Sequence, residues 1–205
     1  MNQELIFKII ILIIAYVIGS LSPSTFIAKY IYGFDIRSRG SGNPGTTNAY
    51  RTMGGKVALV TLFLDVLKGS LGAYLGYRFV GADFAPFTGL MSVLGHNFPF
   101  YMGFKGGKGV ATSIGVAAVI APKILLICAV FGLIVLFVTK MVSAGSLTGF
   151  VTLVVISIYI YVTQGINSHI IVFLILSILN IYRHRANIKR IFQGTESKIG
   201  KWKHD

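Results

Sequence analysis

The feature that most constrains this chain is a set of long apolar runs that contain almost no charged residues. There are seven of them, at residues 5–32, 57–79, 85–98, 110–121, 124–139, 147–162 and 170–182. Soluble domains carry roughly 25% charged residues, whereas 12% of this chain is charged and 54% is apolar. An ordinary soluble domain is therefore excluded, and the pattern predicts an all-α, polytopic integral membrane protein with seven transmembrane helices.

Two of the runs, 85–98 and 110–121, are short for a straight crossing, because a helix needs about 20 residues to span the hydrocarbon layer. We expect two half-height helices around a polar centre, since irregular backbone at membrane depth must face protein or water. The first run, 5–32, is longer than the apolar region of a signal peptide and is interpreted as an uncleaved span. A single domain over 1–205 is expected.

Basic residues predict the orientation, because Lys+Arg total 19 against 6 Asp+Glu, a net charge of +13. With seven spans and the N-terminus outside, the loops 33–56, 99–109 and 140–146 and the tail from Arg183 hold 14 of these cations. The opposite side holds Lys8, Arg78 and Lys123. The positive-inside rule then places the C-terminus in the cytoplasm, and five spans would give the same orientation. Charge placed by topology needs no nucleic-acid partner.

Three polar segments stand apart from the apolar runs, and all lie on the predicted cytoplasmic side. The first, at 35–51, combines glycines with Ser41, Thr47, Asn48 and Arg51. Glycines allow close backbone approach, successive N–H groups can form an anion-binding nest, and the guanidinium adds charge-assisted hydrogen bonds. The segment is therefore either an anion site or a turn-rich loop.

The second segment contains Gly-His-Asn-Phe-Pro from Gly95 and Phe-Lys-Gly-Gly-Lys-Gly from Phe104. A glycine turn that runs into a helix places free N–H groups, the positive end of the helix dipole and Lys108 at one point, which suits a phosphate. It is not a Walker A loop, because the spacing G-x-x-x-x-G-K-[ST] is absent. Lys105 is either a ligand of the same kind or an interfacial lysine.

In the third segment, Asn180, His184 and Asn187 follow the spacing i, i+4, i+7, which predicts one polar stripe on a helix that faces the bundle interior. His184 is either part of a site or a packing residue. Elsewhere, Asp65 and Lys68 are spaced i, i+3 in the second run and are either a functional or a structural ion pair. Ser143 and Ser146 lie in the predicted connection 140–146 and either bind substrate or cap a helix.

Absent patterns exclude several chemistries. The acidic residues are isolated, so there is no pair at metal-ligand spacing, and a Mg²⁺-dependent phosphotransferase is disfavoured. No H-x-x-x-x-D sequence follows His96, His169 or His184, and no Ser-His-Asp arrangement is evident. We expect no metal and no cofactor. The remaining inventory is cationic and rich in donors, which suits phosphate groups beside an acyl chain.

Together these segments resemble the PlsY family, bacterial membrane glycerol-3-phosphate acyltransferases that use acyl phosphate as the donor. Four motifs carry the resemblance between Gly19 and Glu196: Gly-Ser-Gly-Asn-Pro-Gly-Thr-Thr-Asn with Arg51, Leu-Asp-x-x-Lys-Gly, Gly-His-Asn-Phe-Pro with Phe-Lys-Gly-Gly-Lys-Gly-Val-Ala-Thr, and Tyr-Arg-His-Arg-x-Asn-Ile. Thr46 departs from the frequent Ala of the family, and Ala186 from the frequent Glu.

The resemblance implies a seven-helix fold and transfer of a fatty acyl group from acyl phosphate to the position-1 hydroxyl of glycerol 3-phosphate. The products would be 1-acyl-glycerol 3-phosphate (lysophosphatidic acid) and phosphate. The residues assigned on this hypothesis as catalytic are Ser41, Arg51, Lys108, His184 and Asn187. Those assigned to substrate binding are Thr47, Asn48, His96, Lys105, Gly106, Gly107, Gly109, Ser143, Ser146 and Asn180. Those assigned a structural role are Asp65, Lys68 and Glu196.

In this hypothesis Lys108, Arg51 and His184 meet the phosphate of glycerol 3-phosphate, and the proton acceptor is either His184 or a substrate phosphate. The expected partners are the two substrates, membrane lipids and a soluble enzyme that makes acyl phosphate. The expected location is the bacterial cytoplasmic membrane, with the active site facing the cytoplasm. A transporter for a phosphorylated solute is the competing class, but no inverted repeat is visible and every polar segment lies on one side.

Overall fold

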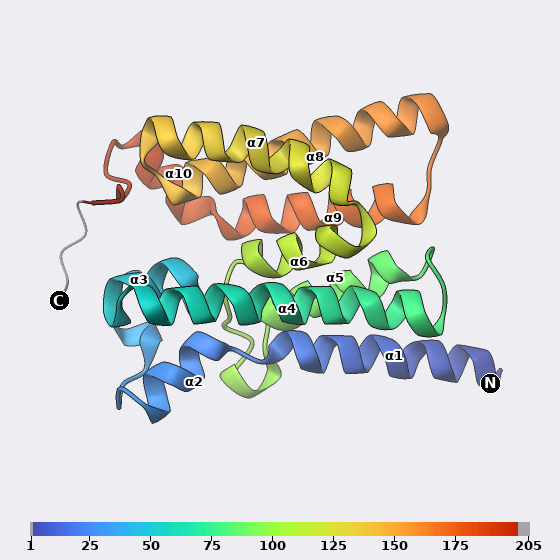
Figure 1. The fold of residues 1–205 in the computed structure, drawn as a ribbon, viewed down its shortest axis with the longest axis horizontal. Coiled ribbons are helices and arrows are strands. Elements are labelled where there is room, and N and C mark those ends of the chain that lie inside the picture. The colour runs from blue at the N-terminus through green and yellow to red at the C-terminus, as the bar shows by residue number, and fades with distance from the viewer. Residues whose placement is uncertain (1, 201–205) are drawn as a thin grey trace. The chain divides into compact units, whose positions relative to one another are not determined.

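The computed structural model describes residues 2–200, and within that range it contains helices and loops without any strand. The all-helical prediction is confirmed for these residues. Their packing divides the chain into two compact units, one that ends at Ile120 and one that begins at Ala121. In Figure 1 the first unit runs from blue to light green and the second from yellow-green to red. A single domain stays a prediction, and we describe each unit by itself.

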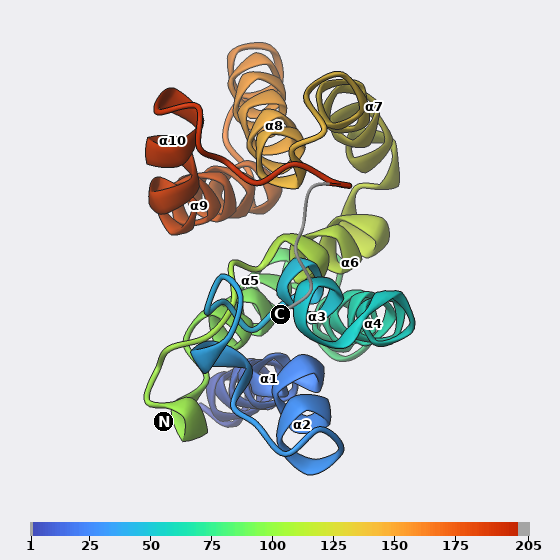
Figure 2. The same ribbon diagram turned by 90° about the vertical axis from the view of Figure 1, so that its left-hand side faces the viewer.

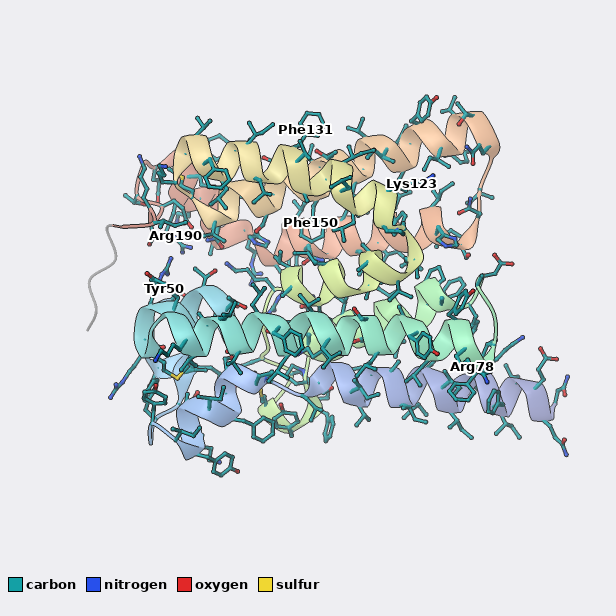
Figure 3. The ribbon with its side chains drawn as sticks, viewed as in Figure 1. Tyr50, Arg78, Lys123, Phe131, Phe150 and Arg190 are labelled. Atoms are coloured by element: carbon teal, nitrogen blue, oxygen red, sulfur yellow. The ribbon has the colours of Figure 1, made fainter. Side chains whose placement is uncertain are left out.

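Unit 1 is organised around its longest helix, α4, which packs against α1, α5 and α6, while α1 also runs along α5 (Figures 1 and 2). Tyr50 and Arg78 mark opposite ends of the α3–α4 segment in Figure 3. The helices of the unit are α1 (Gln3–Ser20), α2 (Pro23–Tyr30), η1 (Ile36–Ser38), α3 (Thr46–Met53), α4 (Gly55–Phe79), α5 (Ala85–Asn97), η2 (Phe100–Met102) and α6 (Val110–Ile120).

Glycines let these helices touch backbone to backbone. A Cβ added to Gly19 or Gly95 would lie 2.0–2.2 Å from a backbone oxygen of the facing helix in the α1–α5 pair. A Cβ on Gly69 or Gly115 would lie 2.0–2.1 Å from a backbone oxygen in the α4–α6 pair. Small residues at such contacts are typical of helix pairs in membranes, where close van der Waals packing replaces the hydrophobic effect.

The predicted span 5–32 is wrong as one helix, because the chain breaks between α1 and α2. Pro23 stands at the start of α2, where its missing N–H costs nothing, and it could not continue α1. The break keeps its backbone groups bonded: the Tyr101 hydroxyl donates to Ser20 O (2.8 Å) and accepts from Ser22 N (3.0 Å). A non-helical link of this kind is tolerated at membrane depth because protein groups satisfy it.

The two short helices are confirmed as short. α5 has 13 residues and α6 has 11, which at about 1.5 Å per residue gives roughly 20 and 17 Å. Both values fall below the roughly 30 Å of hydrocarbon. The predicted run 57–79 also agrees with α4 to within two residues.

In unit 2, α8 packs against α7 on one side and α9 on the other (Figure 2). The helices are α7 (Pro122–Thr139), α8 (Val142–Gln164), α9 (Ser168–Arg183) and α10 (Arg185–Phe192). No described residue of α7 is buried, and its Phe131 is half exposed, whereas Phe150 of α8 is buried (Figure 3). Gly132 and Gly145 form the close α7–α8 contact.

Two details of unit 2 differ from the prediction. Lys140 takes a left-handed conformation (φ 61°) that ends α7, and α8 starts at Val142, so Ser143 and Ser146 lie in a helix and not in a connection. The helix that carries Asn180 ends at Arg183, and α10 leaves it at an angle of 56°. The single-helix stripe through His184 is therefore wrong, since His184 lies at the bend.

Four helices of the described range are long and apolar enough to cross a membrane: α1, α4, α7 and α8. The bent pair of α9 and α10 makes a fifth if it is counted as one span.

Candidate functional site

Asn48 of α3 shapes the first polar segment in unit 1. Its amide Nδ2 donates to the carbonyl oxygens of Ile36 and Arg39, both at 3.1 Å, and its Oδ1 accepts from the backbone N–H of Ser41 at 2.7 Å. The side chain is 1% exposed. The Asn48 side chain therefore holds the loop that contains Ser41. Thr47 and Arg51 lie on one face of α3, because they are spaced i, i+4.

The glycine turn of the second segment leads directly into α6 at Val110, as expected. The expectation of free N–H groups is wrong for two of its residues, because Gly106 N–H donates to the Asn97 carbonyl and Gly107 N–H to the His96 carbonyl, each at 3.1 Å. The turn is thus held to the end of α5. Gly109, with φ of 86°, then takes a conformation that favours glycine before the helix begins.

Gly107 lies where the first and second segments meet. A Cβ at this position would be 2.1 Å from Nε2 of His96 and 2.9 Å from the carbonyl oxygen of Pro44. The sequence placed these segments on the same side of the membrane, and the structure brings their backbones into contact. Lys108 follows Gly107 and is half-buried, whereas Lys105 is exposed, which separates the two lysines.

Beneath this turn, the predicted ion pair of α4 is confirmed, with Lys68 Nζ 2.7 Å from Asp65 Oδ1. Lys68 Nζ also lies 2.8 Å from His96 Nδ1 and 2.5 Å from the Leu21 carbonyl oxygen at the α1–α2 break. The side chains of Asp65, Lys68 and His96 are all buried. The contacts of His96 described here are thus with the ion pair and the glycine turn, and its substrate-binding role stays a prediction.

Glu196 gathers the polar side chains of unit 2. Its carboxylate accepts hydrogen bonds from Ser143 Oγ, Asn187 Nδ2 and Arg190 Nε, each at 2.7 Å. Burial alone would raise the pKa of Glu196, but these three donors outweigh burial and lower the pKa below its ordinary value of 4.5. We call Glu196 with its three donors the carboxylate latch, because it ties the tail to α8 and α10.

His184 is 2% exposed, and its Nδ1 lies 2.7 Å from the carbonyl oxygen of Asn180. A carbonyl can only accept, so Nδ1 carries the hydrogen and a neutral ring presents Nε2 as its acceptor. The Asn180 side chain donates to Leu176 O at 2.8 Å, and Ser146 Oγ donates back to Val142 O at 3.0 Å. The bend therefore orients His184 through backbone contacts.

Sequence reasoning missed the bond between Arg190 and Glu196. The available signal was that Glu196 is the only acidic residue between Asp83 and Asp205, in a tail rich in cations. It also missed the hydrogen bond from Lys68 to the Leu21 carbonyl oxygen, because a pattern of side chains does not predict which backbone carbonyl will accept. Among residues 2–200 there is no group of three or more His, Cys, Asp or Glu side chains able to hold a metal ion.

The fold and these residues define a class before any comparison. The protein is all-helical in the described range, has apolar helices of membrane-spanning length, and carries buried polar side chains together with a glycine turn followed by a lysine. Such a combination is typical of an integral membrane protein that handles an anionic group.

Comparison with known proteins specifies the class further. A family profile described as "Glycerol-3-phosphate acyltransferase" matches residues 9–194. A glycerol-3-phosphate acyltransferase of Alkaliphilus metalliredigens is 43% identical over 95% of this chain and 97% of its own. One of Bacillus subtilis is 44% identical over 94% and 97%. The chain belongs to the glycerol-3-phosphate acyltransferase family.

Two solved structures of PlsY, an integral membrane glycerol 3-phosphate acyltransferase, have the same fold. The glycerol 3-phosphate form superposes with a TM-score of 0.86 at 37% identity, and the lysophosphatidic acid form with 0.83 at 36%. Each match covers 95% of this chain and 96% of the other.

Proposed function

We propose that this membrane acyltransferase transfers a fatty acyl group from acyl phosphate to the position-1 hydroxyl of glycerol 3-phosphate. The observation that carries the proposal is the glycine turn, held against α5 so that half-buried Lys108 precedes the first turn of α6. Family membership and the two forms of PlsY, named for glycerol 3-phosphate and lysophosphatidic acid, support it. The products are 1-acyl-glycerol 3-phosphate and inorganic phosphate.

The chemistry asks for positioning more than for a strong nucleophile. The acceptor hydroxyl forms a bond to the acyl carbon, the bond from that carbon to the phosphate oxygen breaks, and phosphate leaves. Acyl phosphate is a mixed anhydride with a good leaving group, so charge neutralisation and orientation supply most of the acceleration. The hydroxyl proton passes either to Nε2 of His184 or to a substrate phosphate, whose second pKa is about 6.

The roles proposed for unit 1 rest on residue type and on the resemblance to the family. Lys108 and Arg51 neutralise phosphate, and Ser41 and Thr47 hold the acyl phosphate. Asn48 acts through the loop, because its own hydrogen bonds hold the backbone of Ser41 and of the turn before it. In unit 2, we propose that His184 and Asn187 orient the acceptor, with Asn187 held in turn by Glu196.

We further propose seven membrane helices with the N-terminus outside and the C-terminus cytoplasmic, in the bacterial cytoplasmic membrane. Cys128 is the only cysteine, so Cys128→Ala gives a clean background for labelling. Asp83→Cys, in the exposed α4–α5 loop, should react with a membrane-impermeant thiol reagent in intact cells. Phe192→Cys, 87% exposed at the end of α10, should react only after lysis. The reverse pattern would refute the orientation.

Phosphate release tests the reaction. Purified protein in detergent, mixed with acyl phosphate and glycerol 3-phosphate, should release phosphate and form 1-acyl-glycerol 3-phosphate. Acyl phosphate would be supplied in the cell by a soluble enzyme that makes it. No release, together with solute flux across proteoliposomes, would favour a transporter instead.

Lys108→Ala tests the phosphate role. A charge-assisted hydrogen bond is worth about 1.5–3 kcal/mol, so the KM for glycerol 3-phosphate should rise about 10- to 100-fold. Lys29→Ala is the matched control, since Lys29 is an exposed lysine of α2 in the same unit and its loss makes the same change in net charge. An unchanged KM in Lys108→Ala would refute the role.

A further inference from the structure

The ammonium group of Lys68 is enclosed by three acceptors in the interior of unit 1. Asp65 Oδ1 lies at 2.7 Å, His96 Nδ1 at 2.8 Å and the Leu21 carbonyl oxygen at 2.5 Å. Lys68 Nζ hydrogen-bonds to the Leu21 carbonyl oxygen and to His96 Nδ1, and the Asp65 carboxylate neutralises its charge as an ion pair. Lys68 is thus a cation committed to the protein and not one offered to a substrate.

The same ion pair holds one edge of the His96 ring. Nδ1 of His96 lies 2.8 Å from Lys68 Nζ and 3.4 Å from Asp65 Oδ1, so the ion pair of α4 holds this edge of the ring. The Nε2 edge packs against Gly107, where an added Cβ would come within 2.1 Å of it. Lys68 therefore sets the orientation of the ring on which the glycine turn rests.

The end of α5 holds the turn a second time, through its backbone. The carbonyl of His96 accepts the N–H of Gly107, and the carbonyl of Asn97 accepts the N–H of Gly106. Lys108 is the next residue along the chain. Its backbone position consequently follows from the position of His96.

The turn of α4 that carries Lys68 also positions the start of α6. Gly69 packs against the backbone of Thr112, where an added Cβ would lie 2.1 Å from the carbonyl oxygen. Gly115 packs in the same way against Val66 of α4. One segment of α4 thus holds the glycine turn through a side chain and the following helix through its backbone.

We propose that Asp65, Lys68 and His96 are positioning residues for the acyl transfer reaction. They hold the glycine turn so that Lys108 and the first turn of α6 meet the phosphate of glycerol 3-phosphate. For His96, this positioning role replaces the predicted role in substrate binding. This inference rests on the proposed function. It means that three buried side chains, whose charges are neutralised within the protein, affect the affinity for the substrate.

A double-mutant cycle tests whether His96 affects substrate affinity through Lys108, because residues that act through one another give non-additive changes. The KM for glycerol 3-phosphate is measured in wild type, His96→Ala, Lys108→Ala and the double variant. His96→Ala should raise KM at least about tenfold in the wild-type background. In the Lys108→Ala background it should raise KM less than about threefold. Equal factors in both backgrounds would overturn the proposal.

His96→Asn guards against a variant that fails to fold. Its Oδ1 offers Lys68 an acceptor near the former place of Nδ1, but it presents no ring edge to Gly107. Ser92→Ala is the matched control: Ser92 Oγ donates to the Lys68 carbonyl at 3.1 Å in the same buried layer and has no described contact with the turn. His96→Asn should raise KM as His96→Ala does, and Ser92→Ala should leave it unchanged.

Hydrogen exchange separates this proposal from the proposed function. Amide exchange of the peptide around 104–110 should be at least about tenfold faster in His96→Asn than in wild type or Ser92→Ala, because the turn loses its support. Unchanged exchange in His96→Asn would refute the positioning role whatever the kinetics. Absence of acyl transfer by the wild-type protein would instead refute the proposed function.

Discussion

Replacing Gly107 with alanine tests how closely the glycine turn is fitted. The new Cβ would stand 2.1 Å from Nε2 and 2.9 Å from Cε1 of His96, and 2.9 Å from the carbonyl oxygen of Pro44. Non-bonded heavy atoms pack at about 3.5–4.0 Å, so the turn must move by more than about 1 Å. The His96 ring cannot simply yield, because Lys68 holds its other edge.

A displacement of about 1 Å in a positioned group costs on the order of 100-fold in rate, or about 2.7 kcal/mol of transition-state stabilisation. Gly107→Ala should therefore lower kcat/KM for glycerol 3-phosphate about 100-fold. The assay follows phosphate release by purified variants in detergent, with acyl phosphate held at saturation.

Gly103→Ala supplies the matched control a few residues away. Gly103 has φ of 64° and nothing within 4 Å of an added Cβ, so the change meets open space. It should cost roughly 1 kcal/mol of stability through backbone strain and leave kcat/KM within about threefold. A Gly107→Ala enzyme with near-wild-type kcat/KM, or a Gly103→Ala enzyme equally impaired, would refute the reasoning.

The other predictions concern unit 2. Glu196→Gln should lower the thermal midpoint, because loss of the negative charge weakens the hydrogen bonds from Ser143, Asn187 and the 39% exposed Arg190 by about 1–2 kcal/mol; a wild-type midpoint would contradict the latch. The pKa of Glu196 is lowered by folding, so its stabilisation is complete above the ordinary value of 4.5 and is lost as pH falls through the lowered pKa. The midpoint of wild type should therefore drop more steeply than that of Glu196→Gln when scanned from pH 7 to acid. For His184→Gln, a kcat at least about 100-fold lower is expected if His184 takes the proton, and an unchanged kcat excludes it.

Much of the helical layout is predictable from the sequence, because long apolar runs end where the sequence turns polar or breaks at proline and glycine. The runs 57–79, 85–98 and 110–121 match α4, α5 and α6 to within two residues. The run 5–32 failed for a physical reason: continuous hydropathy does not register a missing backbone donor, and Pro23 divides the run into two helices. The start of α8 at Val142 was missed because serine occurs both in connections and in the first turns of helices.

The candidate site was predicted as a set of residues but not as a set of contacts. Glycine and lysine spacing identified the turn before α6, yet the sequence does not show that Asn97 and His96 use the N–H groups of Gly106 and Gly107. Such bonds depend on how α5 ends relative to a loop that returns to it. The sequence likewise does not show that the Asn48 amide bonds to its own loop, because an asparagine at this position could equally bind a ligand.

The backbone contacts at Gly19, Gly95, Gly69 and Gly115 limit where the fatty chain of the proposed donor can lie. At these positions no room is left for a single added methyl group, and a fatty chain is wider than that. At these glycines a fatty chain does not fit between α1 and α5 or between α4 and α6. For the acyl phosphate donor proposed above, we therefore expect the fatty chain to lie outside both helix contacts.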